Sequence, residues 1–466
     1  MNINPIFSLG AYLIILFSAF LSLFTWLHFK DRKNYRITAY ITIIILITAY
    51  AFLYSWSDMN LNLATLNFNH LNSLTTAFFL FLIIFSIISS MDRLSEEKVK
   101  EGEYYFLLSM ILLGSSILVS TRNIFTMFIS LELMSMSLYG IIGINRAKES
   151  SEAALKYFLL SSLASIFIVF SLGFIYVSAS SLELNKIRET LLLPNYDLTL
   201  IIGLLFLMTG FIFKIALVPF HLWVADIYYG SPSQVSALMS SLIKVSGIIV
   251  LFRIYSYCHV PAIERTLVFF SGLTMIISNL MALPQKNIKR ILAYSSISHS
   301  GYIILGFFTN DYWQVFYYIL VYSIATFGAF SSVLLLEKNQ KGIELDDIKG
   351  LFYKSPFISG LFSIFILSLA SIPPMAGFFG KFYLFLNAIN NGHSGLVLIA
   401  VITSIISLYY YLRIITSMFK PSNEETTNNI SYNNLLNIFI FAILTLILGV
   451  FSNRIISLLK FSVLFN

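Results

Sequence analysis

The sequence predicts an all-α polytopic membrane protein with about 14 transmembrane helices, since about 20 apolar residues cross a bilayer as one helix. Hydrophobic residues fill 58% of the 466 positions. Charged residues fill only 11%, whereas soluble domains carry about 25%. The mean hydropathy is +0.83. These values exclude a soluble enzyme, a disordered chain and a nucleic-acid-binding protein.

The expected spans are separate apolar stretches, and no stretch between them is long enough for a soluble domain. We therefore predict one membrane domain over residues 1–466. A cleaved signal peptide has basic residues before its apolar run. No basic residue precedes Lys30, so we expect the first stretch to be a retained span. The stretches are 7–28, 35–56, 72–91, 104–120, 123–143, 154–179, 199–220, 233–255, 266–283, 291–309, 313–336, 357–390, 394–418 and 434–452.

The basic residues predict the orientation in the membrane. Eighteen of the 29 Lys and Arg residues fall in or beside the connections on one side, and seven fall on the other side. Cytoplasmic loops are enriched in Lys and Arg. The bias predicts that both termini lie on the outer side of a bacterial cytoplasmic membrane, and it explains the net charge of +7.

Arg36, Arg253 and Arg413 lie toward span ends and are counted with the adjoining connections. Five other charged residues fall inside the expected spans: Glu132, Lys156, Lys214, Lys244 and Lys381. A charge at the bilayer centre costs about 2.5–3.5 kcal/mol and usually marks an ion path. The alternative for each lysine is that its ammonium reaches the lipid headgroups. That alternative is strongest for Lys156, near a span end, and weakest for Lys244, at mid-span. Glu132 has its own alternative, as a structural partner that only neutralises a lysine.

These residue types suit proton transport. Burial in hydrocarbon disfavours the charged form of a lysine, and a nearby carboxylate favours it again. A change of partner would therefore switch a lysine between proton-holding and proton-releasing states. We expect His221 and His299 to extend this chain of groups.

Two spans are interrupted in a similar way. Pro219 follows Lys214 by five residues, and Pro373, Pro374 and Gly377 precede Lys381. Proline removes a backbone donor and clashes with the preceding turn, so both helices should break. A pair of Pro/Gly-interrupted spans indicates an inverted repeat with an ion site at the midplane. Two ordinary kinked helices are the alternative.

Redox cofactors are not expected on this chain. The single cysteine, Cys258, cannot ligate an iron–sulfur cluster by itself. The six histidines are scattered without metal-ligand spacing, and no glycine-rich nucleotide motif is present. We therefore expect no metal on this chain, and any redox chemistry must belong to another subunit.

Several stretches between residues 100 and 420 together carry a family resemblance. The chain resembles the antiporter-like membrane subunits of respiratory complex I, or NADH–quinone oxidoreductase, most closely those of the subunit N type. Two departures, Ala225 before Asp226 and Gln234 after Ser233, affect turn geometry only. The matching stretches are Leu131–Glu132–Leu133 to Tyr139, Glu152–Phe158, Phe213–Trp223, Lys286–Ser296 with His299 and Tyr302, and Ile372–Tyr383.

The resemblance implies a role for each matched residue. Glu132 would pair with Lys214 and tune its charge, and Lys156 would modulate that pair. Lys244 would be the central relay. Lys381 would be the terminal site.

The resemblance also implies a fold and partners. Two inverted five-helix repeats would occupy residues 104–255 and 266–418, and His299 would belong to the polar axis between the lysines. NADH, flavin, iron–sulfur clusters and quinone would be bound by partner subunits. Neighbouring antiporter-like subunits and the lipid bilayer would surround the chain.

Two other functions remain open at this stage. A subunit of a multi-subunit sodium/proton antiporter shares the Glu132, Lys214 and Lys244 equivalents, but Glu152–Phe158 and the Tyr228–Pro232 turn favour the redox complex. An unrelated solute carrier would need Asn, Gln or Arg in its spans, where Ser, Tyr and Lys predominate. Copurification with NADH dehydrogenase chains would separate the first two functions.

Overall fold

The computed structural model describes a helical membrane protein. Thirteen helices within the described residues are long and apolar enough to cross a membrane. The predicted stretch 357–390 is instead two shorter helices, and each of the other thirteen predicted stretches overlaps one of these spans. The fold class is therefore confirmed. The described residues are 9–28, 35–55, 61–63, 66–96, 99–194, 197–308, 312–337, 342–421 and 432–464.

The chain forms two compact units. Unit 1 comprises Met1–Lys214, Ser246–His259 and the last two residues, and unit 2 comprises Ile215–Val245 and Val260–Leu464. This division differs from the predicted halves 104–255 and 266–418. The chain leaves unit 1 at the break that follows Lys214, whereas the sequence suggested a boundary between two spans.

Unit 1 is built around α5, whose span is 78% buried. Helices α2, α4 and α6 pack against it. Gly114 permits a close approach, because a Cβ there would lie 2.8 Å from the Ser130 carbonyl oxygen of α6. A small antiparallel hairpin, Leu61–Leu63 (β1) with Leu66–Phe68 (β2), is an addition that the hydropathy did not predict. The helices are α2 (Gly10–His28), α3 (Tyr35–Ser55), α4 (His70–Glu96), α5 (Glu101–Ser120), α6 (Ile124–Ile142), α7 (Lys148–Ala179), α8 (Leu184–Leu191) and α9 (Leu198–Ile215).

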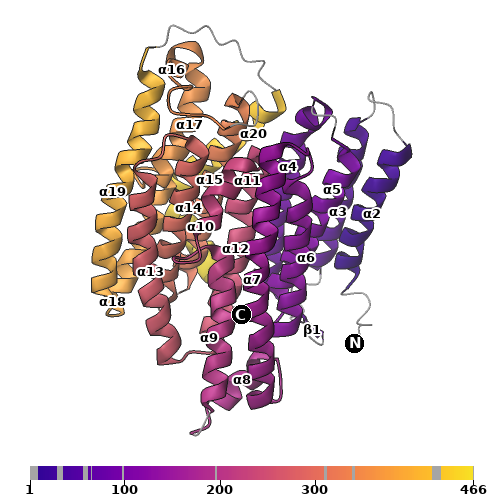
Figure 1. The fold of residues 1–466 in the computed structure, drawn as a ribbon, viewed down its shortest axis with the longest axis vertical. Coiled ribbons are helices and arrows are strands. Elements are labelled where there is room, and N and C mark those ends of the chain that lie inside the picture. The colour runs from indigo at the N-terminus through magenta and orange to yellow at the C-terminus, as the bar shows by residue number, and fades with distance from the viewer. Residues whose placement is uncertain are drawn as a thin grey trace. The chain divides into compact units, whose positions relative to one another are not determined.

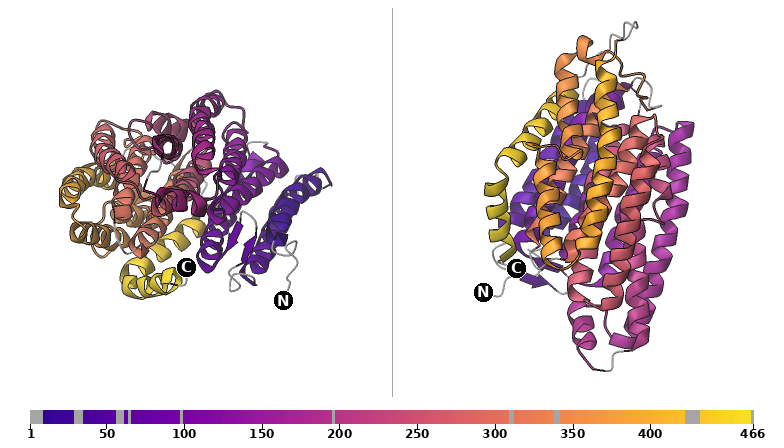
Figure 2. Two further views of the ribbon diagram at one scale, coloured as in Figure 1. Left: turned by 90° about the horizontal axis from the view of Figure 1, so that it is seen from below. Right: turned by 90° about the vertical axis from the view of Figure 1, so that its left-hand side faces the viewer.

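Unit 2 has two entirely buried spans, Ser233–Tyr257, which runs on into unit 1, and Ile288–Phe308. Helices α13, α14 and α19 run side by side (Figure 1), and Figure 2 shows this orange-to-yellow part from two further directions. Its elements are α10 (Leu222–Gly230), α11 (Ser233–Leu238), η3 (Met239–Ile243), α12 (Lys244–Tyr257, mostly unit 1), α13 (Pro261–Ala282), α14 (Ile288–Leu305), η4 (Gly306–Phe308), α15 (Trp313–Leu336), α16 (Leu351–Lys354), α17 (Pro356–Leu369), α18 (Ala376–Asn390), α19 (Ser394–Phe419), α20 (Tyr432–Val450) and α21 (Ser452–Leu464).

Both predicted helix breaks are present. Helix α9 ends at Ile215, and Ala216 has a positive φ of 62°. Helix α17 ends at Leu369, and Ser371 has a positive φ of 61°. L-residues rarely adopt this left-handed region. Each such residue lies three positions before a proline with a cis peptide bond, Val218–Pro219 and Pro373–Pro374.

At each break a side-chain hydroxyl accepts a hydrogen bond from a backbone N–H, either in the turn after the helix or in the first turn of the next helix. The Val218 N–H donates to Thr274 Oγ1 at 2.9 Å. The Gly377 N–H donates to Ser368 Oγ at 3.2 Å. Backbone polar groups at membrane depth need such partners. The hydroxyls thus allow both helices to break without leaving these donors unsatisfied.

A π-helical turn, η3, directly precedes Lys244. Such turns insert an extra residue into a helix and often occur at functional sites. The turn interrupts the α-helical register between α11 and α12, so it alters the face on which Lys244 lies. The sequence carried no proline or glycine signal for it.

Candidate functional site

Lys214 forms the polar centre of unit 1. It is the next-to-last residue of α9, and it is only 5% exposed. Its ammonium donates to Ser135 Oγ of α6 at 2.9 Å and to Ser161 Oγ of α7. The Tyr157 ring centroid lies 5.9 Å from Lys214 Nζ. Two hydroxyls and an aromatic face therefore replace water around the charge.

Glu132 reaches the same region through another serine. Its carboxylate accepts a hydrogen bond from Ser165, which lies one turn of α7 beyond Ser161. No ion pair joins Glu132 to Lys214 in the described structure, although the carboxylate charge acts on the ammonium. The two groups are instead connected by the serines of α7. The described structure therefore shows no direct contact between the two groups, whereas the resemblance implies that they pair.

Lys156 lies apart from this cluster. It forms an ion pair with Glu152 at 2.8 Å, one turn earlier on α7. Its side chain is 43% exposed, in contrast with the other candidate lysines. The placement agrees with the alternative in which Lys156 reaches the membrane surface.

Lys244 begins α12 and is 2% exposed. Its ammonium donates to the Ser296 carbonyl oxygen at 2.7 Å and to Ser296 Oγ at 3.0 Å. Ser296 lies in the middle of α14. Lys244 is therefore held by neutral oxygen atoms of one residue, in a fully buried part of unit 2.

His299 lies one turn after Ser296 on α14 and bonds to two tyrosines. Its Nδ1 lies 2.6 Å from the Tyr318 hydroxyl, and its Nε2 lies 3.1 Å from the Tyr411 hydroxyl. The Tyr411 hydroxyl also bonds to Ser295 Oγ. A neutral imidazole donates from one nitrogen and accepts at the other. The two tyrosines can therefore exchange a proton through the ring.

Lys381 lies on α18, beyond the second break, and is 3% exposed. Its ammonium donates to Ser404 Oγ of α19 at 2.8 Å. The ammonium also lies 4.3 Å from the centroid of the Tyr302 ring, which is the geometry of a cation–π contact. The Tyr302 and His299 ring centroids are 5.8 Å apart on α14. The contacts of Lys244 with Ser296 and of Lys381 with Tyr302 therefore lie on either side of His299 along α14.

His221 does not join Lys244, His299 or Lys381 by any hydrogen bond that the structure shows. Its Nε2 lies 3.3 Å from Met281 Sδ. The sequence analysis also missed Tyr318, Tyr411 and the buried ion pair Lys289–Glu337. Nothing local in the sequence connects these residues with their partners.

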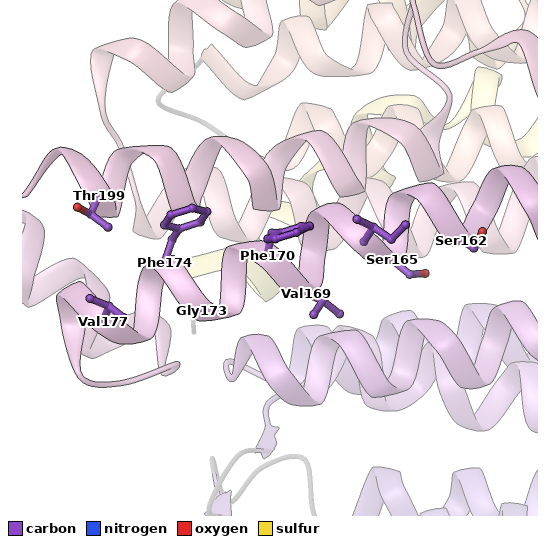
Figure 3. Close-up of a pocket in the computed structure, with 9 residues that line it drawn as sticks. Ser162, Ser165, Val169, Phe170, Gly173, Phe174, Val177 and Thr199 are labelled. Carbon is purple, nitrogen blue, oxygen red and sulfur yellow. The ribbon is translucent and has the colours of Figure 1, made fainter.

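An apolar groove of about 770 Å³ runs along α7 (Figure 3). Phe170 and Phe174 line it together with Thr199 of α9, and Ser165 lies toward one end. None of its lining residues is charged. The groove is therefore apolar, and Ser165, which donates to Glu132, connects it to the Lys214 cluster. No group of three or more potential metal ligands occurs among the described residues.

Comparisons with known proteins give a consistent result. Residues 121–407 match the family described as NADH:quinone oxidoreductase/Mrp antiporter, TM. A protein of Koribacter versatilis, named NADH-quinone oxidoreductase subunit N 1, is 36% identical over 394 residues, which cover 81% of this chain and 77% of that protein. A Thermodesulfovibrio yellowstonii protein of the same name is 39% identical over 361 residues, or 75% and 77% of the two chains.

Two solved structures share the fold. A chain of respiratory complex I from Thermus thermophilus has a TM-score of 0.83 and 28% identity, with 96% of this chain and 98% of that chain covered. A chain of the Mrp complex from Dietzia sp. has a TM-score of 0.86 at 19% identity, with 99% and 97% covered. The second likeness shows the fold alone.

Proposed function

Because this chain belongs to the NADH:quinone oxidoreductase/Mrp antiporter transmembrane family, we propose that it is the proton-translocating subunit N of an NADH–quinone oxidoreductase. In that complex, electron transfer from NADH to quinone drives proton transport across the membrane. Glu132, Lys214, Lys244, His299 and Lys381 carry out the transport on this chain.

One observation carries the proposal: three lysines are almost fully buried in apolar spans, and each is bonded to neutral oxygen atoms. Insertion of a charged lysine at this depth costs about 2.5–3.5 kcal/mol on membrane-insertion scales. Residues that carry this insertion cost are expected mainly where they have a function. A lysine whose partners do not neutralise it can lose its proton with little reorganisation of the protein.

The residues of unit 2 give a route for the proton. The Lys244 ammonium releases its proton at the Ser296 hydroxyl, which lies one turn of α14 from His299. The His299 ring accepts a proton at one nitrogen from one tyrosine hydroxyl and releases its own proton from the other nitrogen to the second tyrosine. The first hydroxyl regains a proton from the preceding group, and the second passes its own hydroxyl proton on. Lys381, which lies over the Tyr302 ring, accepts the proton at the end of this route. In unit 1, Glu132 stabilises the Lys214 ammonium through the α7 serines.

The redox groups belong to partner subunits in this proposal. Flavin and iron–sulfur clusters supply electron transfer from NADH to quinone when they are bound there. The single Cys258 is buried and cannot hold a cluster by itself. We therefore expect the isolated chain not to oxidise NADH.

Neighbouring antiporter-like subunits and the bilayer surround the chain in the complex. The loop charges favour a bacterial cytoplasmic membrane with both termini on the outer side. Some residues of that argument, including Lys30, Arg32, Lys33 and Lys98, lie outside the described residues. A sodium/proton antiporter subunit is the second candidate, because the Mrp chain shares the fold.

Copurification tests the proposal against this alternative. A tagged form of the chain is expressed in its native host, extracted in mild detergent and purified under conditions that retain complexes. We expect NADH dehydrogenase chains and NADH:quinone activity to copurify with it. Recovery of only antiporter subunits, without NADH oxidation, would replace the redox complex by the second candidate.

A further inference from the structure

A fully buried ion pair lies outside the lysine group described above. Lys289 Nζ and Glu337 Oε1 are 2.9 Å apart, and both side chains have 0% exposure. Lys289 is the second residue of α14, and Glu337 directly follows α15. The pair therefore joins the beginning of one buried span to the end of the next.

The same pair binds the beginning of the helix that leads to Lys244. Ser233 Oγ, in the first turn of α11, donates to Glu337 Oε2 at 2.5 Å. Lys289 Nζ also donates to the Ser231 carbonyl oxygen at 3.1 Å. Glu337 Oε1 also accepts a hydrogen bond from the Gly342 N–H at 3.0 Å. A buried ion pair is weak evidence for stability, since its desolvation cost is large. Its position suggests a role in function.

Buried polar groups continue from the pair toward Lys244. On α14, Ser296 follows Lys289 by seven residues, which places both on the same face two turns apart. The Tyr322 hydroxyl of α15 has two polar neighbours, the hydroxyls of Thr326 on the same helix and of Ser296 on α14. Ser296 Oγ in turn accepts a hydrogen bond from the Lys244 ammonium.

Three atoms along this route have no hydrogen-bond partner in the described structure. They are the Tyr322 hydroxyl, Thr326 Oγ1 and Gln234 Oε1, each in a side chain that is at most 3% exposed. Gln234 is next to the Ser233 that binds Glu337. Buried polar atoms of this kind are normally satisfied by water. The three atoms are thus each suited to form a hydrogen bond with water.

We propose that the Lys289–Glu337 pair is the gate of a proton path that runs along α14 and α15, past Thr326, Tyr322 and Ser296, to Lys244. This inference rests on the proposed function, and it adds the group that controls access to the central lysine.

The transfer conserves protons at each step. A hydronium ion gives a proton to a Glu337 carboxylate oxygen and leaves as water. The neutral carboxyl no longer pairs with the Lys289 ammonium, so the contact loosens. The carboxyl passes the proton to water bound by the Thr326 and Tyr322 hydroxyls. Each carrier accepts one proton and releases one, and the neutral Lys244 amine accepts the last. Glu337 becomes a carboxylate again, and the pair re-forms.

Conservative variants separate this path from a purely structural clasp. The double variant Tyr322→Phe/Thr326→Val removes two hydroxyls and retains the volume of both side chains. Glu337→Gln removes the charge and retains groups that hydrogen-bond to Ser233 and Gly342. Ser332→Ala is the matched control, because this buried α15 hydroxyl bonds within its own helix, to the Gly328 carbonyl oxygen at 2.9 Å.

Proton translocation and NADH oxidation are measured with the assembled complex in sealed vesicles. We expect the double variant and Glu337→Gln to lower the protons moved per NADH several-fold, with normal assembly, and Ser332→Ala to match the parent. Parent-like translocation in the double variant would overturn the path. That result would overturn the path even if Glu337→Gln prevents assembly, because the ion pair would then have only a structural role. If Lys244→Ala loses proton translocation in the same experiment, such a failure concerns the gate and not the proposed function.

Discussion

The two broken spans hold their lysines in different ways. Lys214 donates to two serine hydroxyls and experiences the charge of Glu132. Lys381 donates to one serine hydroxyl and lies over an aromatic ring. No carboxylate forms an ion pair with Lys381 in the part of the chain that the structure describes. The ammonium of Lys381 thus depends on neutral groups alone.

The helix ends reinforce this difference. Lys214 is the next-to-last residue of α9, so the negative end of the helix dipole stabilises its charge by about 0.3–1 kcal/mol. Lys381 is the sixth residue of α18, on the N-terminal side of that helix, and it lacks this stabilisation. The same kind of break therefore serves two purposes. It retains a charge in unit 1 and leaves a charge easily released in unit 2.

The largest effect is expected at Lys244, which has neither a carboxylate partner nor a helix C-terminus nearby. Lys244→Ala should lower proton translocation by about a thousandfold, within the range that a positioned acid–base group contributes. Coupled NADH oxidation should fall as well. Lys244→Arg should not restore transport, because arginine stays charged. Transport is measured in sealed vesicles with the assembled complex.

The control for this experiment is Lys156→Ala, which changes an exposed lysine of α7. It should transport protons at close to the parental rate. Full transport in Lys244→Ala, with normal assembly, would contradict the account of both units.

The second prediction concerns the packing of the second break. A Cβ on Gly377 would lie 1.8 Å from the Ser368 carbonyl oxygen, so Gly377→Ala must displace backbone atoms. We expect a destabilisation of about 3 kcal/mol, the upper part of the usual range for overpacking. The measurement is the temperature at which the detergent-solubilised complex loses this subunit.

Gly360→Ala is the matched control, because a Cβ there meets nothing within 4 Å on α17. An equal loss of thermal stability in the two variants would show that the close contact at the break is unimportant.

The smallest effect is expected from the carboxylate that distinguishes the two sites. Glu132→Gln retains a hydrogen-bond partner for Ser165 but removes the charge. Transport should fall about fivefold, since a partner charge contributes about 1 kcal/mol. Glu152→Gln, an exposed change on α7, should have little effect. Equal transport in these two variants would mean that Glu132 is a structural partner only.

Sequence reasoning predicted the features that depend on local chemistry. Pro219 and Pro374 marked both breaks because proline disrupts a helix wherever it occurs in the interior. Lys214, Lys244 and Lys381 stood out because charges are rare in apolar stretches. The functional resemblance followed from the residues around them.

Tertiary features were not accessible from the sequence. Lys289 and Glu337 fell in segments assigned to loops, and only folding brings them together across 48 residues. Tyr318 and Tyr411 were two among 27 tyrosines, with nothing local to connect them to His299. The π-helical turn before Lys244 likewise has no composition signal. Lys156 shows the reverse case, since a charge near a span end is exposed in the structure.

The central claim is that buried lysines titrate, and Lys381→Arg tests it most directly. Arginine retains the positive charge and can reach the same hydroxyl and ring, but it cannot release a proton near neutral pH. Proton transport by the assembled variant is measured in sealed vesicles during NADH oxidation. The account predicts normal assembly with strongly impaired transport. Transport equal to that of the parent would show that Lys381 only anchors α18 and would contradict the claim.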